Sequence, residues 1–242
     1  MIADDVLFKQ LEYVLDNTDF SALGTSYCGK VRDSYTRGDL RYLITSDRLS
    51  CFDRVVTTVP FKGQVLQSLA ASWFQLSQDI IPNHIIDIPD PNVMVVKNCE
   101  ILPVEVVVRN YLAGSAWRDY SAGKPISGVK LPSGMRESQR LPSPIITPST
   151  KAEQGKHDMP ISEDEIVRLN LVDKNLWSQV RECALLLFAL GQEAAAQKGL
   201  ILVDTKYEFG IYKGSLILAD EIHTLDSSRY WEESSYKALY EK

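Results

Sequence analysis

Three charged residues in one short segment carry the strongest chemical signal in the sequence. Lys206 and Glu208 are two residues apart in a predicted β-strand, so their side chains share one face. Asp220 ends the next apolar run, 216–220, which is typical of the returning strand of a hairpin. With a three-residue turn at 213–215, Glu208 would lie opposite Asp220, with about 5 Å between Cβ atoms. Such carboxylates repel unless a cation lies between them, and Mg²⁺ prefers hard oxygen ligands.

The same hairpin also has a structural interpretation. Lys206 can pair with Glu208 on a solvated polar face, and the sequence does not decide between this and a metal site. A two-residue turn would shift the register by one and remove the opposition of Glu208 and Asp220.

Four other segments combine polar side chains with turn residues in a way that suits anions. Gly29, Lys30 and Arg32 place two cations on one face of a predicted hairpin, although no Walker loop is present. Arg109 ends a buried strand and Ser115 precedes a helical segment, so an Arg fork and helix N–H groups suit a phosphate there. The other two segments are 226–229, which contains Arg229, and 46–54, which contains Arg48, Ser50 and Asp53. The structural alternatives are an ordinary charged strand at 28–33, an ion pair of Arg109, and an Asx turn in 46–54.

The elements that position these residues follow from hydrophobic periodicity and turn signals. Strands are predicted at 27–35, 40–45, 93–96, 104–108, 200–203, 208–212 and 216–220. Helices are predicted at 64–78, from Ser162 with a capping box to Glu165, and at 174–198 before Gly199. The polar tail from 232 is expected to fray or to form a short helix.

Residues 121–160 form a long segment of low periodicity that holds six of the eleven prolines. A loop of this length is uncommon in a compact domain, so we expect either a functional loop or a mobile surface excursion. A β-rich first part followed by a mixed part predicts an α+β protein of two lobes. The predicted domains are 1–100, the β-rich lobe with the hairpin of Lys30, and 101–242, with the boundary in 98–103.

Composition excludes several classes of protein. The net charge of −6 argues against a general nucleic-acid binder, and no apolar run approaches the roughly 20 residues of a membrane span. The acidic start lacks a basic signal-peptide region, and the four cysteines form no disulfide framework, so a cytoplasmic protein is expected. The three histidines are far apart, which makes a structural zinc site unexpected. The oligomeric state is left open.

Taken together, these segments resemble the phosphoribosylaminoimidazole-succinocarboxamide synthase (SAICAR synthetase) family. The specific matches are LPSPIITPSTKAEQGKHD at 141–158 and LVDTKYEFG at 202–210. Shorter matches are 29–33, 46–53, 106–115, 219–221 and 226–231, in the order of the family over roughly 25–231. Members with this type of loop are expected to continue well past 231.

The resemblance implies a fold and a reaction. The fold is similar to ATP-grasp proteins and kinases, with an ATP site between two lobes. The reaction joins L-aspartate to a carboxylated aminoimidazole ribonucleotide, with ATP and Mg²⁺, through an acyl phosphate. The protein's contribution is then mainly positioning and charge neutralisation.

The resemblance also implies site residues. Those expected at the nucleotide are Gly29, Lys30, Val31 and Arg32 on the ATP phosphates, Leu102 at the adenine, and Glu208 and Asp220 on Mg²⁺. Those expected at the substrates are Arg109, Ser115 and Arg229 on the ribonucleotide phosphate, Lys206, Lys151 and Asp158 at the reacting carboxylate, and Arg48, Ser50 and Asp53 at aspartate. Lys206, Lys30 and Asp158 are the expected catalytic residues.

Two rival functions share part of this pattern. A small-molecule kinase would use Lys30, Glu208 and Asp220 but would need neither an aspartate site nor the second anion cluster. A non-catalytic nucleotide-binding relative is disfavoured because Lys206, Glu208 and Asp220 occur together.

Overall fold

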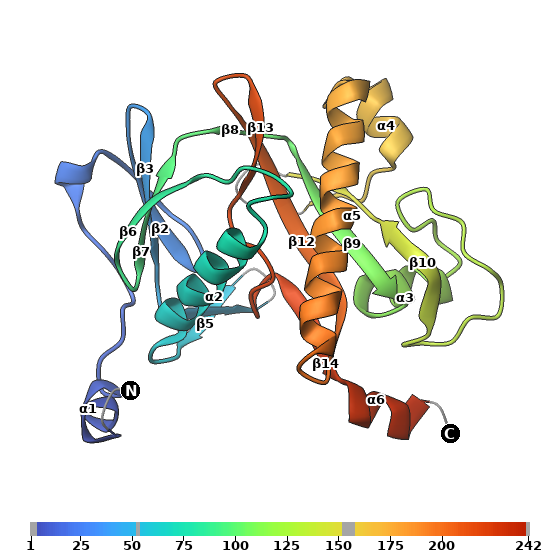
Figure 1. The fold of residues 1–242 in the computed structure, drawn as a ribbon, viewed down its shortest axis with the longest axis horizontal. Helices are drawn as coiled ribbons and strands as arrows, with labels where there is room; N and C mark the ends of the chain where they lie inside the picture. Colours follow the sequence, from blue (N-terminus) through green and yellow to red (C-terminus); the bar gives the residue numbers. More distant parts are fainter. Residues whose placement is uncertain (1–3, 52–53, 152–157, 241–242) are drawn as a thin grey trace. The chain divides into compact units, whose positions relative to one another are not determined.

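The computed structural model describes residues 4–51, 54–151 and 158–240, which form two compact units. The N-terminal unit comprises Met1–Gln75 and Asn83–Cys99, and the C-terminal unit comprises Leu76–Pro82 and Glu100–Lys242. Both contain helices and strands, in agreement with the predicted α+β class (Figure 1). The assignment of roles to domains 1–100 and 101–242 stays a prediction.

The N-terminal unit is built on a five-stranded antiparallel sheet in the order β1-β2-β3-β7-β6. Its strands are β1 (Thr25–Cys28), β2 (Arg32–Arg37), β3 (Leu40–Thr45), β6 (Ile85–Asp90) and β7 (Val93–Lys97), with a separate pair β4 (Arg48–Cys51) and β5 (Arg54–Thr58). Its helices are α1 (Asp4–Gln10), the 3-10 helix Ser21–Leu23 and α2 (Lys62–Leu76). The predicted strand 27–35 is in fact two strands, because the chain turns back at 29–31.

Helix α2 begins two residues earlier than the periodicity indicated. The Asp47 carboxylate accepts a hydrogen bond from the backbone N–H of Gly63 (2.9 Å), which satisfies a donor of the first turn. A side chain at Gly63 would collide with the carbonyl of Thr45, so glycine allows β3 and α2 to approach closely. The Thr45 hydroxyl donates to Gln67 Oε1 (3.0 Å) and ties the sheet to the helix.

The C-terminal unit is built on a seven-stranded sheet whose central path is β10-β9-β12-β13. Strand β11 also pairs with β9, and β8 and β14 pair with β12. The strands are β8 (Glu100–Ile101), β9 (Val104–Tyr111), β10 (Arg140–Ile146), β11 (Ser149–Thr150), β12 (Leu200–Tyr212), β13 (Ser215–Ala219) and β14 (Ser228–Glu232). The helices are α3 (Gly114–Ser121), α4 (Glu163–Arg168), α5 (Lys174–Ala196) and α6 (Glu233–Tyr240).

Helix α5 crosses one face of this sheet and covers β12 (Figure 1). Its buried stripe includes Trp177, Val180, Leu187 and Phe188, and the exposed side is mostly polar apart from residues such as Leu186. The capping box of α4 forms as predicted, with Ser162 accepting from Glu165 N. No described helix, α5 included, is apolar over a length that could cross a membrane.

Two expectations for this unit were wrong. The segment 121–160 was expected to be a loop, but it contains β10 and β11. The prolines of β10 argued against a strand, and they are tolerated here because β10 is at the edge of the sheet. The predicted strands 200–203 and 208–212 are one strand of 13 residues, β12. The polar residues Asp204 and Thr205 interrupt its apolar pattern, yet both are buried.

Candidate active site

Three carboxylates of the C-terminal unit surround one ammonium group. Lys206 Nζ lies 2.7 Å from Glu208 Oε1, 2.9 Å from Glu105 Oε1 and 4.0 Å from Asp220 Oδ2. Lys151 Nζ contacts the other oxygen of Glu208. The structure therefore brings together the predicted residues Lys206, Lys151, Glu208 and Asp220, and it adds Glu105. The Lys206–Glu208 pair of the structural interpretation is also present.

The predicted opposition of Glu208 and Asp220 across the hairpin was wrong. The turn contains only Lys213 and Gly214, whose φ angles of 50° and 81° are those of a two-residue hairpin turn. Glu208 consequently pairs with Ala219, one position before Asp220.

Asp220 reaches the site by a different route. It follows the last residue of β13 and has a φ of 62°, a left-handed conformation that Asp and Asn tolerate better than most residues. The backbone thus leaves the strand at Asp220, and its carboxylate meets the Lys206 ammonium in spite of the shifted register.

The ionisation of this group follows from burial and charge. Burial by itself would lower the pKa of Lys206, but Glu208, Asp220 and Glu105 together outweigh it and raise the pKa. Burial raises the pKa of Glu105, and the nearby Lys206 only partly offsets this shift. Lys206 is therefore a permanent cation at neutral pH and a poor general base.

A second charged group lies where β12 is flanked by β9 and β14. Asp204 on β12 is the direct cross-strand neighbour of Arg109 on β9 and of Arg229 on β14. Its two carboxylate oxygens lie 2.9 Å from Arg109 Nη1 and 3.6 Å from Arg229 Nε. Two cations share one carboxylate, so a net positive charge is left for an anion.

The first turn of α3 completes this anion cluster. Arg109 Nη2 donates to the hydroxyl of Ser115 (3.1 Å). Gly114 has a φ of 60°, and a Cβ there would collide with the Arg229 guanidinium, so that group lies against the start of the helix. The structure thus brings together the predicted phosphate-binding residues Arg109, Ser115 and Arg229. The ion pair of Arg109, given above as the structural alternative, is present as well.

One face of β9 connects the two charged groups. Arg109, Val107 and Glu105 alternate along the strand and share this face. Arg109 and Val107 line a cleft of about 220 Å³, together with Ser115, Asp119, Thr147 and Asp158. Glu105 contacts Lys206. Arg109 and Glu105 are four positions apart, or about 13 Å along β9, and Lys206 on β12 pairs with Val107 between them.

The loop that carries Asp220 is anchored by a buried histidine. His223 is 1% exposed, and its Nε2 forms a 2.5 Å hydrogen bond with the Tyr207 hydroxyl. The Tyr230 hydroxyl donates to the carbonyl of His223 (3.0 Å). A side chain at Gly191 on α5 would collide with the imidazole ring, so glycine leaves room for it. Burial lowers the pKa of His223 to about 3.

This burial predicts a pH-dependent stability. Unfolded His223 binds a proton below about pH 6.5, whereas the folded residue stays neutral to about pH 3, so stability falls as the pH drops through that range. Between pH 7 and pH 5 we expect the residue to remove about 2 kcal/mol. Urea unfolding at both pH values, with His223→Gln as the comparison, measures it. Equal pH slopes for the two proteins would contradict the prediction.

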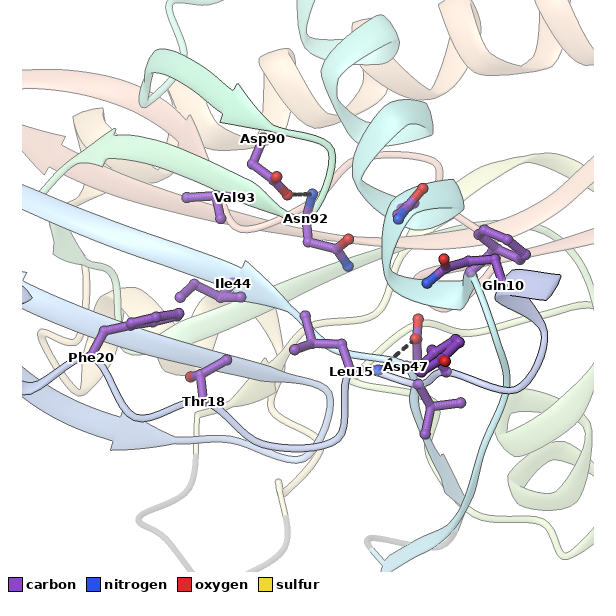
Figure 2. A pocket seen from close by; sticks show the side chains of 13 residues that line it. Gln10, Leu15, Thr18, Phe20, Ile44, Asp47, Asp90, Asn92 and Val93 are labelled. Carbon is purple, nitrogen blue, oxygen red and sulfur yellow. Dashed lines mark hydrogen bonds between the residues drawn. The ribbon is translucent and has the colours of Figure 1, made fainter. Parts of the chain in front are cut away.

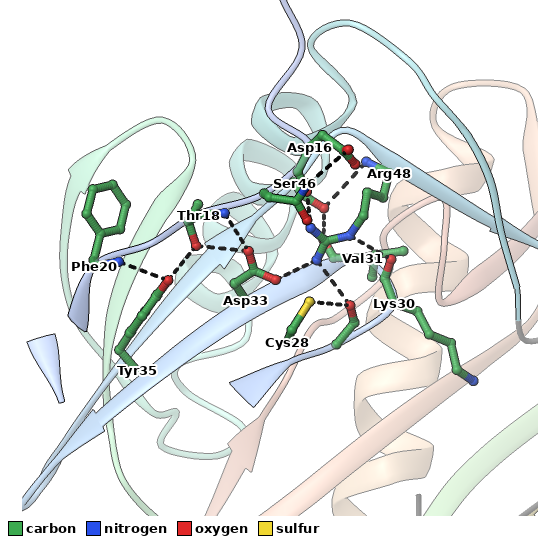
Figure 3. Close-up of polar contacts among 12 residues, drawn as sticks. Asp16, Thr18, Phe20, Cys28, Lys30, Val31, Asp33, Tyr35, Ser46 and Arg48 are labelled. Atoms are coloured by element: carbon green, nitrogen blue, oxygen red, sulfur yellow. Dashed lines mark hydrogen bonds and ion pairs between the residues drawn. The ribbon is translucent and has the colours of Figure 1, made fainter. Parts of the chain in front are cut away.

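The N-terminal unit uses Arg48 to hold its first hairpin (Figure 3). The Arg48 guanidinium donates to the carbonyls of Lys30 (3.1 Å), Gly29 (3.1 Å) and Asp16, and it pairs with Asp33 (2.6 Å). Arg48 is only 4% exposed. This side chain is buried and supports the hairpin, and the prediction that Arg48 faces aspartate stays a prediction.

The hairpin loop itself remains at the surface. The Ser46 hydroxyl donates to the carbonyl of Val31 (2.8 Å), and Gly29 N donates to the carbonyl of Arg32 (2.8 Å). Figure 3 shows the Lys30 side chain extending away from the Arg48 network, and Lys30 is exposed. The roles of Gly29, Lys30, Val31 and Arg32 toward ATP stay predictions.

The roles of Ser50, Asp53 and Leu102 also stay predictions. Ser50 lies on β4 opposite Val55, and Asp53 lies outside the described residues. The N–H of Leu102 donates to the carbonyl of Phe209 (2.9 Å), so an adenine contact through that N–H would have to break this bond.

Asp47 has a structural role, but its hydrogen bonds are not those of an Asx turn, because both N–H donors are distant in the sequence. Besides Gly63 N, it accepts a hydrogen bond from Leu15 N (2.9 Å), which fixes the N-terminal segment (Figure 2). A cavity of about 470 Å³ lies between this segment and the start of α2, and none of the predicted site residues lines it.

Sequence reasoning missed Glu105 and Asp204. Asp204 continues the alternation of Lys206 and Glu208, so the period of two places it on their face. Glu105 continues the alternation of Arg109 and Val107 on β9 in the same way. Their partners depend on which strands are neighbours, which the sequence does not state.

Comparisons with known proteins point to one family. A family model described as SAICAR synthetase matches residues 25–242. A putative phosphoribosylaminoimidazole-succinocarboxamide synthase 2 of Agrobacterium fabrum is 50% identical over 230 residues, which cover 92% of this chain and 73% of that protein. A phosphoribosylaminoimidazole-succinocarboxamide synthase of Legionella pneumophila is 49% identical over 224 residues, covering 90% and 71%.

Solved structures with similar folds carry informative ligands. The SAICAR synthase of Saccharomyces cerevisiae in complex with SAICAR superposes with a TM-score of 0.83 and 34% identity, covering 92% of this chain and 81% of that one. A type-2 SAICAR synthetase in complex with ADP superposes with a TM-score of 0.76 and 28% identity, covering 90% of each chain.

Proposed function

Since the chain belongs to the SAICAR synthetase family, we propose that it joins L-aspartate to 5-amino-1-(5-phospho-D-ribosyl)imidazole-4-carboxylate, with ATP as the phosphoryl donor. The products are SAICAR, ADP and phosphate, and the reaction belongs to purine biosynthesis. A cytoplasmic location is part of this proposal.

The observation that carries the proposal is the pair of charged groups on β9. A ribonucleotide carboxylate has a phosphate at one end and a carboxylate at the other, so it needs positive charge at two places a fixed distance apart. At the carboxylate end, Lys206 and Lys151 would need a bound Mg²⁺ to outweigh Glu105, Glu208 and Asp220. Arg109 marks one end of the shared face and Glu105, which holds Lys206, marks the other. A simple kinase of a neutral substrate would need only one of the two groups, which favours the ligase.

The anion cluster fits the ribonucleotide phosphate. Arg109 and Arg229 provide planar guanidinium groups, and Ser115 adds a hydroxyl at the start of α3. We propose that these residues fix the phosphate and thereby place the imidazole carboxylate near Lys206.

The described residues fit Mg²⁺ only if substrate phosphates and water provide the rest of its ligands. No three His, Cys, Asp or Glu side chains within the described ranges are grouped closely enough to hold a metal ion by themselves. Glu208 and Asp220 provide two hard carboxylates, and Mg²⁺ typically takes one or two carboxylates together with substrate phosphates and water. Bound there, the ion would neutralise phosphate charge during transfer.

On the N-terminal unit, we propose that Gly29, Lys30, Val31 and Arg32 contact the ATP phosphates, and that Leu102 of the C-terminal unit contacts the adenine through its backbone. Arg48 acts as a positioning residue, because it holds the carbonyls of Gly29 and Lys30 in place.

The chemistry then has two balanced steps. An oxygen of the imidazole carboxylate attacks the γ-phosphorus of ATP, the bond to ADP breaks, and an acyl phosphate forms. The amine of aspartate attacks the acyl carbon, phosphate leaves, and the nitrogen loses a proton. Lys206, charged at neutral pH, neutralises the carboxylate in the first step. We propose that Asp158, which lines the cleft, accepts the proton in the second step.

A phosphate-release assay tests this function. ATP, Mg²⁺ and the ribonucleotide are supplied with or without L-aspartate, and SAICAR is measured in parallel. We expect release that requires both substrates and equals SAICAR formed. Release that ignores aspartate would favour a kinase, and nucleotide binding without turnover would favour a non-catalytic relative.

The close contact between the Arg229 guanidinium and the backbone of Gly114 gives a second prediction. Gly114→Ala is expected to raise KM for the ribonucleotide about 10-fold and to leave KM for ATP unchanged, because the new methyl group displaces the guanidinium. Steady-state kinetics with each substrate varied measure the effect.

The matched control is Gly123→Ala. Gly123 also has a positive φ, of 67°, but a Cβ there meets nothing within 4 Å, so it carries the backbone strain without the collision. Equal changes in both variants would show that strain alone is responsible.

A further inference from the structure

Asp119 is a carboxylate in the wall of the ribonucleotide cleft for which the proposed function has no use. It lines the cleft with Arg109 and Ser115 and is half-buried. It lies on α3 four residues after Ser115, so both side chains are on the same face of the helix, one turn or about 6 Å apart. Among the described residues, none donates a hydrogen bond or an ion-pair contact to its carboxylate.

A carboxylate in this cleft is unfavourable for phosphate binding, because it would repel a bound anion. Its presence therefore calls for an explanation. Burial lowers the pKa of Arg109, and the charges of Asp204 and Asp119 oppose that shift, so Asp119 acts on the anion cluster. Asp204 already orients Arg109 through a direct bond, whereas Asp119 makes none. Placed there, Asp119 weakens phosphate binding by repulsion unless another part of the ligand donates hydrogen bonds to it.

The order of groups along the cleft identifies that part. Arg109 and Ser115 lie at the phosphate end, and Asp158 acts electrostatically on Glu105, so it lies toward Lys206 at the reacting end. Asp119 is one helical turn from Ser115, a spacing comparable to that between a 5′-phosphate and the hydroxyls of its own ribose. An ionised carboxylate only accepts hydrogen bonds, and a ribose diol offers two O–H donors.

We propose that Asp119 binds the 2′- and 3′-hydroxyls of the ribose and makes the cleft selective for a ribonucleotide over its deoxy analogues. This inference rests on the proposed function, because it takes the Arg109 cluster as the phosphate site. Loss of a hydrogen bond to a charged group corresponds to about 10- to 100-fold in affinity.

The test compares the ribonucleotide with its 2′-deoxy and 3′-deoxy analogues in wild-type protein and in Asp119→Ala. We expect wild-type kcat/KM to be at least about 10-fold lower for a deoxy analogue, and the ratio to fall below about 3 in the variant. Arg118→Ala is the matched control, since Arg118 is the exposed neighbour on α3 and does not line the cleft.

The outcomes separate this inference from the function itself. A ratio unchanged in Asp119→Ala, or a wild type that does not discriminate, would overturn the ribose contact while leaving the ligase activity established. If wild type shows no turnover, the proposed function fails, and calorimetric binding of the same three nucleotides tests the ribose contact separately.

Discussion

Asp220→Asn is expected to lower kcat about 1,000-fold while the urea midpoint of unfolding stays close to that of wild type. The substitution removes the charge of one of the two proposed Mg²⁺ ligands. Asparagine tolerates the left-handed backbone at this position, where φ is 62°, so the loop should keep its shape. Alanine would be a poorer test because it adds backbone strain. Steady-state turnover with Mg²⁺ varied, together with urea unfolding, measures both effects.

The matched control for this variant is Asp164→Asn, the same change at an exposed carboxylate in the first turn of α4. We expect its kcat to stay within about twofold of wild type, since surface substitutions rarely have larger effects. Near wild-type turnover of Asp220→Asn would refute the metal assignment.

Lys206→Met is expected to lower kcat/KM at least about 1,000-fold and to destabilise the protein by about 3 kcal/mol at pH 8. Removal of the ammonium leaves Glu105 and Glu208 close together without their shared cation, and their side chains are only 14% and 6% exposed. Burial already raises the pKa of Glu105, and removal of Lys206 takes away the charge that partly offsets this shift, so the pKa of Glu105 rises further.

The sign of the pH effect follows from that shift. A carboxyl with a raised pKa in the folded state destabilises the protein above that pKa and ceases to do so once it is protonated. The stability deficit of Lys206→Met relative to wild type should therefore shrink as the pH falls from 8 to 5. Lys206→Arg, which keeps the charge, should not show this dependence. A deficit that is constant with pH would indicate lost packing instead of lost charge.

The Arg48 result shows why residue type alone does not assign a role. The segment 46–54 is dense in polar groups, which is equally typical of a ligand site and of a structural hydrogen-bond network. Arg48 donates to three backbone carbonyls and one carboxylate of its own unit. Arg48 therefore supports the hairpin of Lys30 through hydrogen bonds to main-chain carbonyls. No sequence pattern identifies these carbonyls as its partners.

Features that depend on local geometry follow from the amino-acid sequence alone. Alternation along a strand puts Lys206 and Glu208 on one face whatever the partner strands are. The capping box at Ser162 and the glycine after α5 follow from the chemistry of helix ends, and both are observed. The motif matches identified Arg109, Ser115 and Arg229 as members of one group before their contacts were known.

Features that depend on which strands are neighbours follow only from the folded arrangement of the chain. The hairpin turn, one residue shorter than predicted, moved Glu208 from Asp220 to Ala219. The left-handed backbone of Asp220 restored its contact with Lys206. Glu105 and Asp204 gained their roles because β9 and β14 flank β12, which the alternation within a single strand cannot specify.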